Sequence, residues 1–201
     1  MEWLVISAVV ALAGAVALRA SLRRLGAAAD RMLDEVPALR GDALADGAYG
    51  KIAGRARTTS APVVAPSAGT ACVYCEVVVR RATVGRGGDM RIWREIDRKI
   101  DAVDVVLAVD GREVRVDPRD ALVLRATEAS YPGHVLESWR DPDVTSTVRI
   151  VPVDAEIEIV GTLTREVDAN PAAAADYRET AVTWRLIGTR ERPLVLGVRA
   201  S

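Results

Sequence analysis

The sequence predicts a mainly β protein: a compact, OB-like β-barrel or sandwich preceded by one transmembrane helix and a short amphipathic helix. Three observations support this prediction. An uncharged run, WLVISAVVALAGAVAL, occupies residues 3–18. Apolar residues then recur every three or four positions as far as Val36. After residue 47 the sequence changes to short β-branched runs separated by turn residues, which is typical of barrels and sandwiches.

Residues 1–24 form the predicted membrane anchor. As a helix the run spans roughly 24 Å, slightly less than a bilayer core of about 30 Å. Arg19, Arg23 and Arg24 follow it, so the positive-inside rule predicts that the N-terminus lies outside and the β domain in the cytoplasm. The alternative is a cleaved signal peptide, but a signal peptide carries its positive charge before its apolar core.

Residues 25–47 are predicted to form an amphipathic stalk and a linker. The apolar side chains from Leu25 to Val36 share one helix face, and the helix should end near Pro37. This face would lie on lipid or pack on the β domain. Packing is favoured because the polar face is not basic. Residues 41–50, rich in Gly, Asp and Ala, are typical of a linker.

Residues 48–201 form the predicted β domain. Asp110 and Gly111 lie between two apolar runs, which is a strong hairpin signal because both turn residues adopt positive φ. The strand candidates are residues 49–58, 70–82, 102–109, 112–116, 134–139, 147–151, 155–167 and 180–189. Residues 168–177 are predicted to be an exposed excursion between two strands.

The charge balance argues against a nucleic-acid partner. The chain has 27 basic and 28 acidic residues, whereas nucleic-acid binders carry a basic excess. Residues 80–99 are locally basic and contain Gly85, Gly87 and Gly88, which predicts a flexible loop or hairpin tip. A solvated loop is the plainer interpretation. The alternative is contact with anionic lipid, for which the candidate residues are Arg86, Arg91 and Arg94.

Short motifs follow one another in a specific order after residue 48. Their residues are Gly50, Gly54, Pro66, Gly69, Cys72, Val73, Tyr74, Trp93, Asp110, Gly111, Val116, Asp117, Pro118 and Gly161. Over roughly residues 48–200 this pattern resembles the GIDE-type ("beside a membrane") domain of the membrane-anchored mitochondrial E3 ubiquitin ligase family and its bacterial relatives. The resemblance implies a compact β domain that is held next to a membrane and faces partner proteins.

The chain departs from the eukaryotic ligase pattern in two respects. It has one predicted membrane helix where that ligase has two. A RING domain needs eight Cys or His ligands for its two zinc ions, and this sequence holds two cysteines and one histidine. Ubiquitin-ligase activity carried by this sequence is therefore excluded by counting, although the family label would suggest it.

Cys72-x-x-Cys75 invites a zinc or redox interpretation. The stretch around them is predicted to be a strand, in which these positions point to opposite faces and lie about 10 Å apart, whereas a disulfide needs Cα atoms within about 7 Å. The second half of a zinc site is also missing. We therefore expect two buried structural cysteines, with no metal and no cofactor.

The remaining chemistry gives little support for catalysis. His134 is expected at the surface after the turn at residues 131–133, and no G-x-S-x-G elbow supports a hydrolase that would use it. Trp93, Trp139 and Trp184 are expected in or near the core, because the chain has no Phe. No catalytic residue is predicted.

The predicted function is a membrane-anchored, non-enzymatic scaffold or interaction module, whose partner is another membrane or membrane-associated protein. The first alternative is a lipid-headgroup or small-ligand sensor that uses the basic residues 80–99. A hydrolase that uses His134 is the more distant one.

Overall fold

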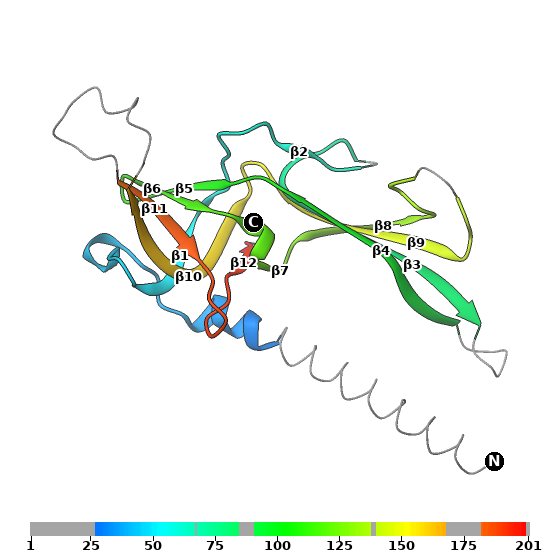
Figure 1. Cartoon of the computed structure of the whole chain (residues 1–201), viewed down its shortest axis with the longest axis horizontal. Helices are drawn as coiled ribbons and strands as arrows, with labels where there is room; N and C mark the ends of the chain where they lie inside the picture. Colours follow the sequence, from blue (N-terminus) through cyan, green and yellow to red (C-terminus); the bar gives the residue numbers. More distant parts are fainter. Residues whose placement is uncertain (1–26, 67, 85–90, 138–139, 168–181, 200–201) are drawn as a thin grey trace, which may run out of the picture.

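The computed structural model describes residues 27–66, 68–84, 91–137, 140–167 and 182–199 (Figure 1). Within these ranges the chain is mainly β, as predicted, and its strands form two curled sheets. The predicted anchor, the excursion at residues 168–177 and Trp139 lie outside the described residues. Among the residues described, no helix has the length and apolar composition to cross a membrane.

The first sheet curls into a half-barrel around the main core (Figure 1). The central strand of this sheet is β10 (Glu156–Val167). It pairs with one strand along one edge and with two shorter strands at opposite ends of its other edge. In spatial order the strands are β5 (Val105–Val109), β6 (Arg112–Val116), β11 (Val182–Ile187), β10 (Glu156–Val167), β12 (Val195–Val198) and β7 (Leu122–Leu124), with β1 (Tyr49–Arg55) paired to β10. Alternate β10 residues, including Ile157 and Ile159, fill the core.

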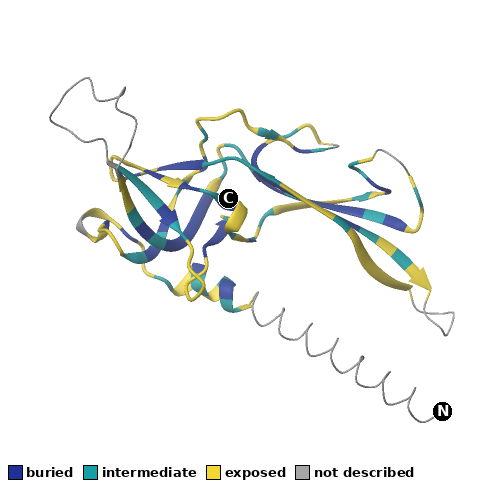
Figure 2. Ribbon diagram, in the orientation of Figure 1, coloured by how far each residue is buried: buried dark blue, intermediate teal, exposed yellow. Residues whose placement is uncertain are grey.

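The second sheet extends away from the half-barrel. Its strands are β2 (Val63–Val64), β3 (Ala71–Val84), β9 (Val144–Pro152) and β8 (Thr127–Pro132), with β4 (Arg91–Ala102) also paired to β3. We call β3, β4, β8 and β9 the arm. Val73, Tyr74 and Val151 belong to the main core, so the root of the arm is packed into the half-barrel. Figure 2 shows buried residues at that root and increasing exposure toward the far end.

The N-terminal helix, described over residues 27–35, packs on the half-barrel. Ala29 and Leu33 are buried against Val160 and Val195. The prediction that the apolar face packs on the β domain is therefore confirmed for the described part of the stalk, because apolar burial outweighs exposure to water.

The predicted linker is wrong at its beginning. Leu39 and Leu44 are buried in the main core, on either side of a short 3-10 helix, η1 (Gly41–Ala43). The backbone N–H of Leu39 donates to the carbonyl of Lys51 at 2.8 Å, which fixes this segment along β1. Two leucines with backbone partners give the segment more packing than its Gly- and Asp-rich composition suggests.

The predicted hairpin at Asp110-Gly111 is confirmed. The two residues have φ values of 48° and 76°, and β5 and β6 pair in register on either side of them. Several strands are close to their predicted ranges, whereas β2, β4, β7, β8 and β12 were not predicted.

A β-bulge corrects the prediction for the two cysteines. Cys72 pairs with Pro152 and Tyr74 pairs with Val151, so Val73 is an extra residue in β3. Such a bulge breaks the alternation of side chains. Val73 and Tyr74 join the main core, while Cys72 and Cys75 enter the same second cluster. The expectation that the thiols point to opposite faces is wrong.

Two further expectations are corrected in the arm. Residues 80–84 and 91–99 form strands, so the flexible-loop interpretation is wrong for them, and residues 85–90 lie outside the description. Residues 134–137 form an isolated bridge and a turn in place of the expected strand, and His134 is buried, not at the surface. The buried Ser146 hydroxyl donates to the carbonyl of Gly133 at 2.7 Å and accepts from the N–H of Val135 at 3.1 Å, which fixes this turn over β9.

Candidate functional site

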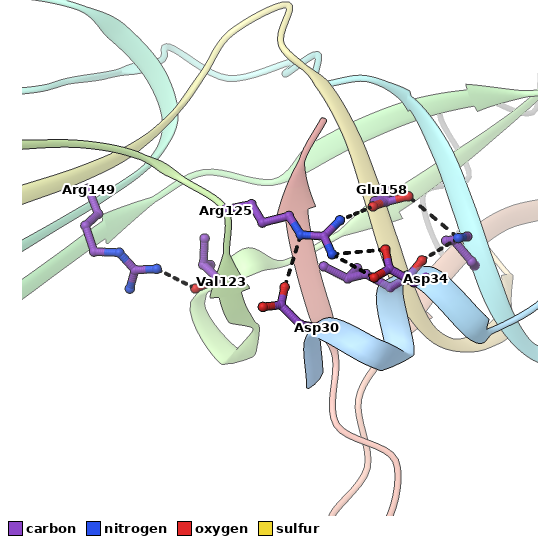
Figure 3. A network of polar contacts seen from close by, with 8 residues as sticks. Asp30, Asp34, Val123, Arg125, Arg149 and Glu158 are labelled. Atoms are coloured by element: carbon purple, nitrogen blue, oxygen red, sulfur yellow. Dashed lines mark hydrogen bonds and ion pairs between the residues drawn. The ribbon is translucent and has the colours of Figure 1, made fainter. Parts of the chain in front are cut away.

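Arg125 joins the N-terminal helix to the half-barrel (Figure 3). Its Nε donates to Asp30 Oδ1 at 3.0 Å and its Nη2 donates to Asp34 Oδ1 at 3.0 Å. Its Nη1 donates to Glu158 Oε1 on β10 at 3.3 Å. The hydrogen bonds that Arg125 donates to the Asp34 carboxylate raise the pKa of Arg125 more than any other contact. One guanidinium therefore binds two carboxylates of the helix and one of the sheet.

The carboxylate of Glu158 is largely buried and contacts two cations. Its side chain is 9% exposed, and Lys51 Nζ lies 3.7 Å from its Oε2. The same Nζ donates to the main-chain carbonyl of Leu33, in the last turn of the helix. A cation at that position interacts favourably with the negative, C-terminal end of the helix dipole. It also donates a hydrogen bond to a carbonyl that has no partner within the helix.

The apolar half of this contact centres on Leu33 and Gly197. Leu33 is fully buried, and a Cβ built at Gly197 would lie 2.6 Å from Leu33 Cδ1. Strand β12 therefore leaves space for the leucine where any other residue would place a side chain. We call the contact of residues 27–35 with the half-barrel, including Arg125, Lys51, Glu158 and Gly197, the helix junction.

Glu76 forms the polar centre of the arm. It is 4% exposed and accepts from Arg98 Nη1 at 2.7 Å and from Arg149 Nη1 at 2.9 Å. These arginines lie on β4 and β9, the strands on either side of β3. A buried carboxylate is stable when it is paired on both sides in this way. Glu76 thus holds the three strands of the arm together.

The arm is also tied to the helix junction through β7. Arg149 Nη2 donates to the carbonyl of Val123 at 2.7 Å, and Arg125 follows two residues later (Figure 3). Arg125 has a φ of 49°, a left-handed conformation that side-chain contacts must hold in place for a residue other than glycine. The segment from Val123 to Arg125 therefore contacts both the arm and the helix.

Tyr74 lies next to this polar centre. Burial raises the pKa of its phenol to about 12, and the negative charge of Glu76 adds to this shift, whereas the charges of Arg149 and Arg98 lower the pKa. The phenol is therefore held in its neutral form by the apolar root of the arm.

The far part of the arm exposes apolar side chains beside arginines. Trp93 is 42% exposed, which corrects the prediction of a core position; β4 is an edge strand in the described sheet, so packing covers it on one side only. Arg91 and Arg94 flank this part of β4 and are exposed, and Arg86 lies outside the described residues. The exposed apolar residues are Val84, Ile92, Trp93, Ile96 and Ile100, which we call the arm patch.

The arm patch presents apolar groups on both faces of the hairpin. Trp93 pairs with Ala82, and Ile92 pairs with Thr83. Because cross-strand partners point to the same face and successive residues to opposite faces, Trp93 and Ile92 lie on opposite faces. A partner that covers both would have to enclose the hairpin rather than lie against one side of it.

The motif residues that carry the family resemblance are structural and spread through the fold. Gly50 and Gly161 are direct partners across β1 and β10, and a Cβ at either would come within 2.4 Å or 2.8 Å of a leucine side chain. Gly69 and Gly111 have positive φ. Asp117 accepts from the N–H of Arg119 at 3.0 Å beside the buried Pro118, at the start of η2 (Pro118–Asp120). Four others are buried strand residues: Cys72, Val73 and Tyr74 in β3, and Val116 in β6. The rest are Gly54 in β1, Pro66 in a turn, Trp93 in the arm and Asp110 in the hairpin turn.

His134 lies beside β4 of the arm. Its Nε2 lies 3.7 Å from Asp97 Oδ2 on β4 and 4.0 Å from Glu137 Oε2. Cys72 and Cys75 are both free and buried, and the Sγ of Cys72 donates to the carbonyl of Val63 at 3.4 Å. The structure brings the two cysteines together, and it places His134 in the turn that covers the same face of the arm.

Sequence reasoning missed the ionic residues of both contacts. Glu76 and Glu158 were the available signals, because each is an acidic residue within a run of apolar strand positions. A charge at such a position predicts a buried ion pair. The partner arginines lie up to 73 residues away along the chain, so spacing alone does not identify them.

A shallow pocket of about 400 Å³ opens beside the helix junction. Lys51 and Glu158 form part of its wall, together with Arg40, Asp110 and Arg199. Both central charges already contact each other and their neighbours, so the pocket is a mixed-charge surface.

Comparison with protein-family models, with curated proteins and with solved structures finds no match to this chain.

Proposed function

We propose that this chain is a membrane-anchored, non-enzymatic interaction module. Its arm would bind a partner that is itself a membrane protein or a membrane-associated protein. The observation that carries the proposal is the helix junction. In this proposal residues 3–18 are the anchor, and the helix at residues 27–35 holds the β domain in a fixed position relative to that anchor. The β domain lies in the cytoplasm and the N-terminus outside.

The contacts of Arg125 support a fixed connection between anchor and domain. Isolated exposed ion pairs contribute only about 0–1 kcal/mol. Here one guanidinium binds three carboxylates, one of them largely buried, and Leu33 adds a fully buried apolar contact. A network with a buried member is worth more than separate surface pairs. The helix and the half-barrel would therefore move as one rigid unit.

The arm patch supports a protein partner. Interfaces are enriched in aromatic residues and arginine, and a few such residues provide most of the binding energy. Trp93 and Ile96 are exposed by 42% and 45%, on a strand that also carries Arg91 and Arg94. The resemblance to a domain that faces partners beside a membrane supports the same proposal.

A second candidate is contact with anionic lipid. The observation that favours it is that Trp93 lies between Arg91 and Arg94 on an exposed strand. Tryptophan is enriched at membrane interfaces, and each basic residue near an anionic surface contributes about 1 kcal/mol. The lipid would then be recognised by its headgroup charge.

Photo-cross-linking in intact membranes tests both candidates. A photoreactive amino acid is placed at Ile96 in the full chain, and at Val64 as the control, because Val64 is 64% exposed but lies outside the arm patch. A protein adduct at position 96 and not at 64 would support the interaction module. A lipid adduct at 96 alone would support the second candidate.

Equal adducts at both positions, or none at 96, would contradict the role of the arm patch. A parallel experiment uses the chain without residues 1–24. Loss of the adduct at position 96 in that variant is expected, because the freed domain is no longer held beside the membrane.

A further inference from the structure

The bulge at Val73 places two thiols side by side inside the arm. Cys72 and Cys75 both join the cluster formed by Val77, Val148 and Ile150, whereas Val73 belongs to the main core. Their partners on β9, Pro152 and Ile150, are two residues apart, so both thiols point to the same face of the sheet. The pair is therefore an organised dithiol in apolar surroundings.

A short strand lies beside Cys72. Strand β2 pairs with β3 at two positions only, Val63 with Cys72 and Val64 with Ala71. Ala65, which directly follows β2, is buried in the same cluster. These two residue pairs are separate from the pairing of β3 with β4 and β9.

The number of nearby ligands limits the ions that fit. Among the described residues, no group of three or more His, Cys, Asp and Glu side chains could hold a metal ion. Zinc and iron–sulfur sites use four protein ligands or clusters of thiolates. Soft thiolates also select Cu(I), a monovalent ion for which two sulfur ligands are sufficient.

We propose that Cys72 and Cys75 bind one Cu(I) ion between their sulfur atoms. Both thiols lose a proton when the ion binds, the two protons leave to solvent, and no atom is oxidised or reduced. The apolar cluster excludes water and additional ligands. This inference does not depend on the proposed function of the arm patch.

The test is an anaerobic Cu(I) titration of the full chain in detergent, with bicinchoninate as a coloured competitor. The expected result is about one Cu(I) per chain, with ultraviolet absorption from the thiolate–copper bond. Cys72→Ser and Cys75→Ser should each weaken binding at least about 100-fold, because outer contacts to a metal site alone are worth 10–100-fold. Val79→Ala is the control, since it alters the same cluster and keeps both thiols.

Three results would overturn the proposal: no competition with bicinchoninate, unchanged binding in a variant that carries both Cys72→Ser and Cys75→Ser, or loss of binding in Val79→Ala equal to that in the serine variants. Circular dichroism checks that each variant folds. If a serine variant does not fold, alkylation of the unmodified chain decides the question. Cu(I) should protect both cysteine peptides, and a Cys72–Cys75 disulfide in place of protection would instead indicate a redox pair.

Discussion

Glu158 and Gly197 are direct partners across β10 and β12, and together they seat the N-terminal helix. Glu158 provides the carboxylate that Arg125 and Lys51 contact. Gly197 provides the space that Leu33 fills. Because partner residues point to the same face of a sheet, the ionic and apolar parts of the helix junction lie next to each other. The position of the helix is thus fixed by a charge and by a missing side chain.

Gly197→Ala should weaken the helix junction. Its methyl group would lie 2.6 Å from Leu33 Cδ1, so Leu33 or the strand must move. Overpacking of this kind costs about 1–3 kcal/mol of unfolding free energy. Gly54→Ala is the control, because its nearest neighbours would lie at 3.6 Å and 3.7 Å. Chemical denaturation of both variants measures the difference, and equal losses would contradict the role of Gly197.

Arg125→Met should destabilise the chain by about 1–3 kcal/mol, because it leaves the largely buried Glu158 with Lys51 alone. Methionine keeps similar length and meets the same left-handed backbone, so the comparison isolates the charge. Arg55→Met removes an exposed pair with Glu156, 2.9 Å apart, and should cost about 0–1 kcal/mol. Thermal unfolding at low and high salt measures both. Equal costs would show that Arg125 acts as an ordinary surface charge.

The sequence predicted features that depend on neighbouring residues. Asp110-Gly111 specifies its turn locally, and the paired strands follow from it. The helical period up to Val36 likewise predicted which face packs on the domain. Features that depend on pairing between distant strands were not predicted. The bulge at Val73 exists only because β3 pairs with β9, where Tyr74 is opposite Val151, and it reverses the orientation expected for Cys75.

The arm shows the same limit. Strand β4 contains charged residues at most positions, so its sequence lacks the apolar alternation that identifies a strand. Its backbone partner is β3, and its charges pair with groups such as Glu76 on that strand. Trp93 was expected in the core because aromatic residues are usually buried. At the edge of a projecting hairpin no second layer covers it within the described structure.

Trp93→Ala should leave stability almost unchanged, within about 0.5 kcal/mol, since substitutions at exposed positions rarely cost more. Trp184 is partly buried against the main core, so Trp184→Ala should cost on the order of 2 kcal/mol through lost apolar burial. Denaturation midpoints measure both variants. The cross-linking at Ile96 should be lost in Trp93→Ala alone. A large loss of stability in Trp93→Ala would instead place Trp93 in a structural role.

Tyr74 should ionise well above the ordinary range, with a pKa of about 12. Ultraviolet absorbance of the phenolate, taken as the difference between the natural chain and Tyr74→Phe, isolates its titration from the other tyrosines. The unfolded chain loses this proton near pH 10 and the folded chain near pH 12. Stability is therefore unaffected by Tyr74 below about pH 10 and falls as the pH rises from about 10 to about 12.

Glu76→Gln should lower the pKa of Tyr74 relative to the natural chain. The charge of Glu76 raises that pKa, while Arg149 and Arg98 lower it and would remain. The control is Glu128→Gln, which removes an exposed carboxylate 3.7 Å from Arg149 Nε and leaves Glu76 in place. Phenolate titration of the two variants gives the comparison. An unchanged pKa in Glu76→Gln would mean that burial alone keeps Tyr74 neutral. The charges of the arm would then have no effect on the pKa of Tyr74.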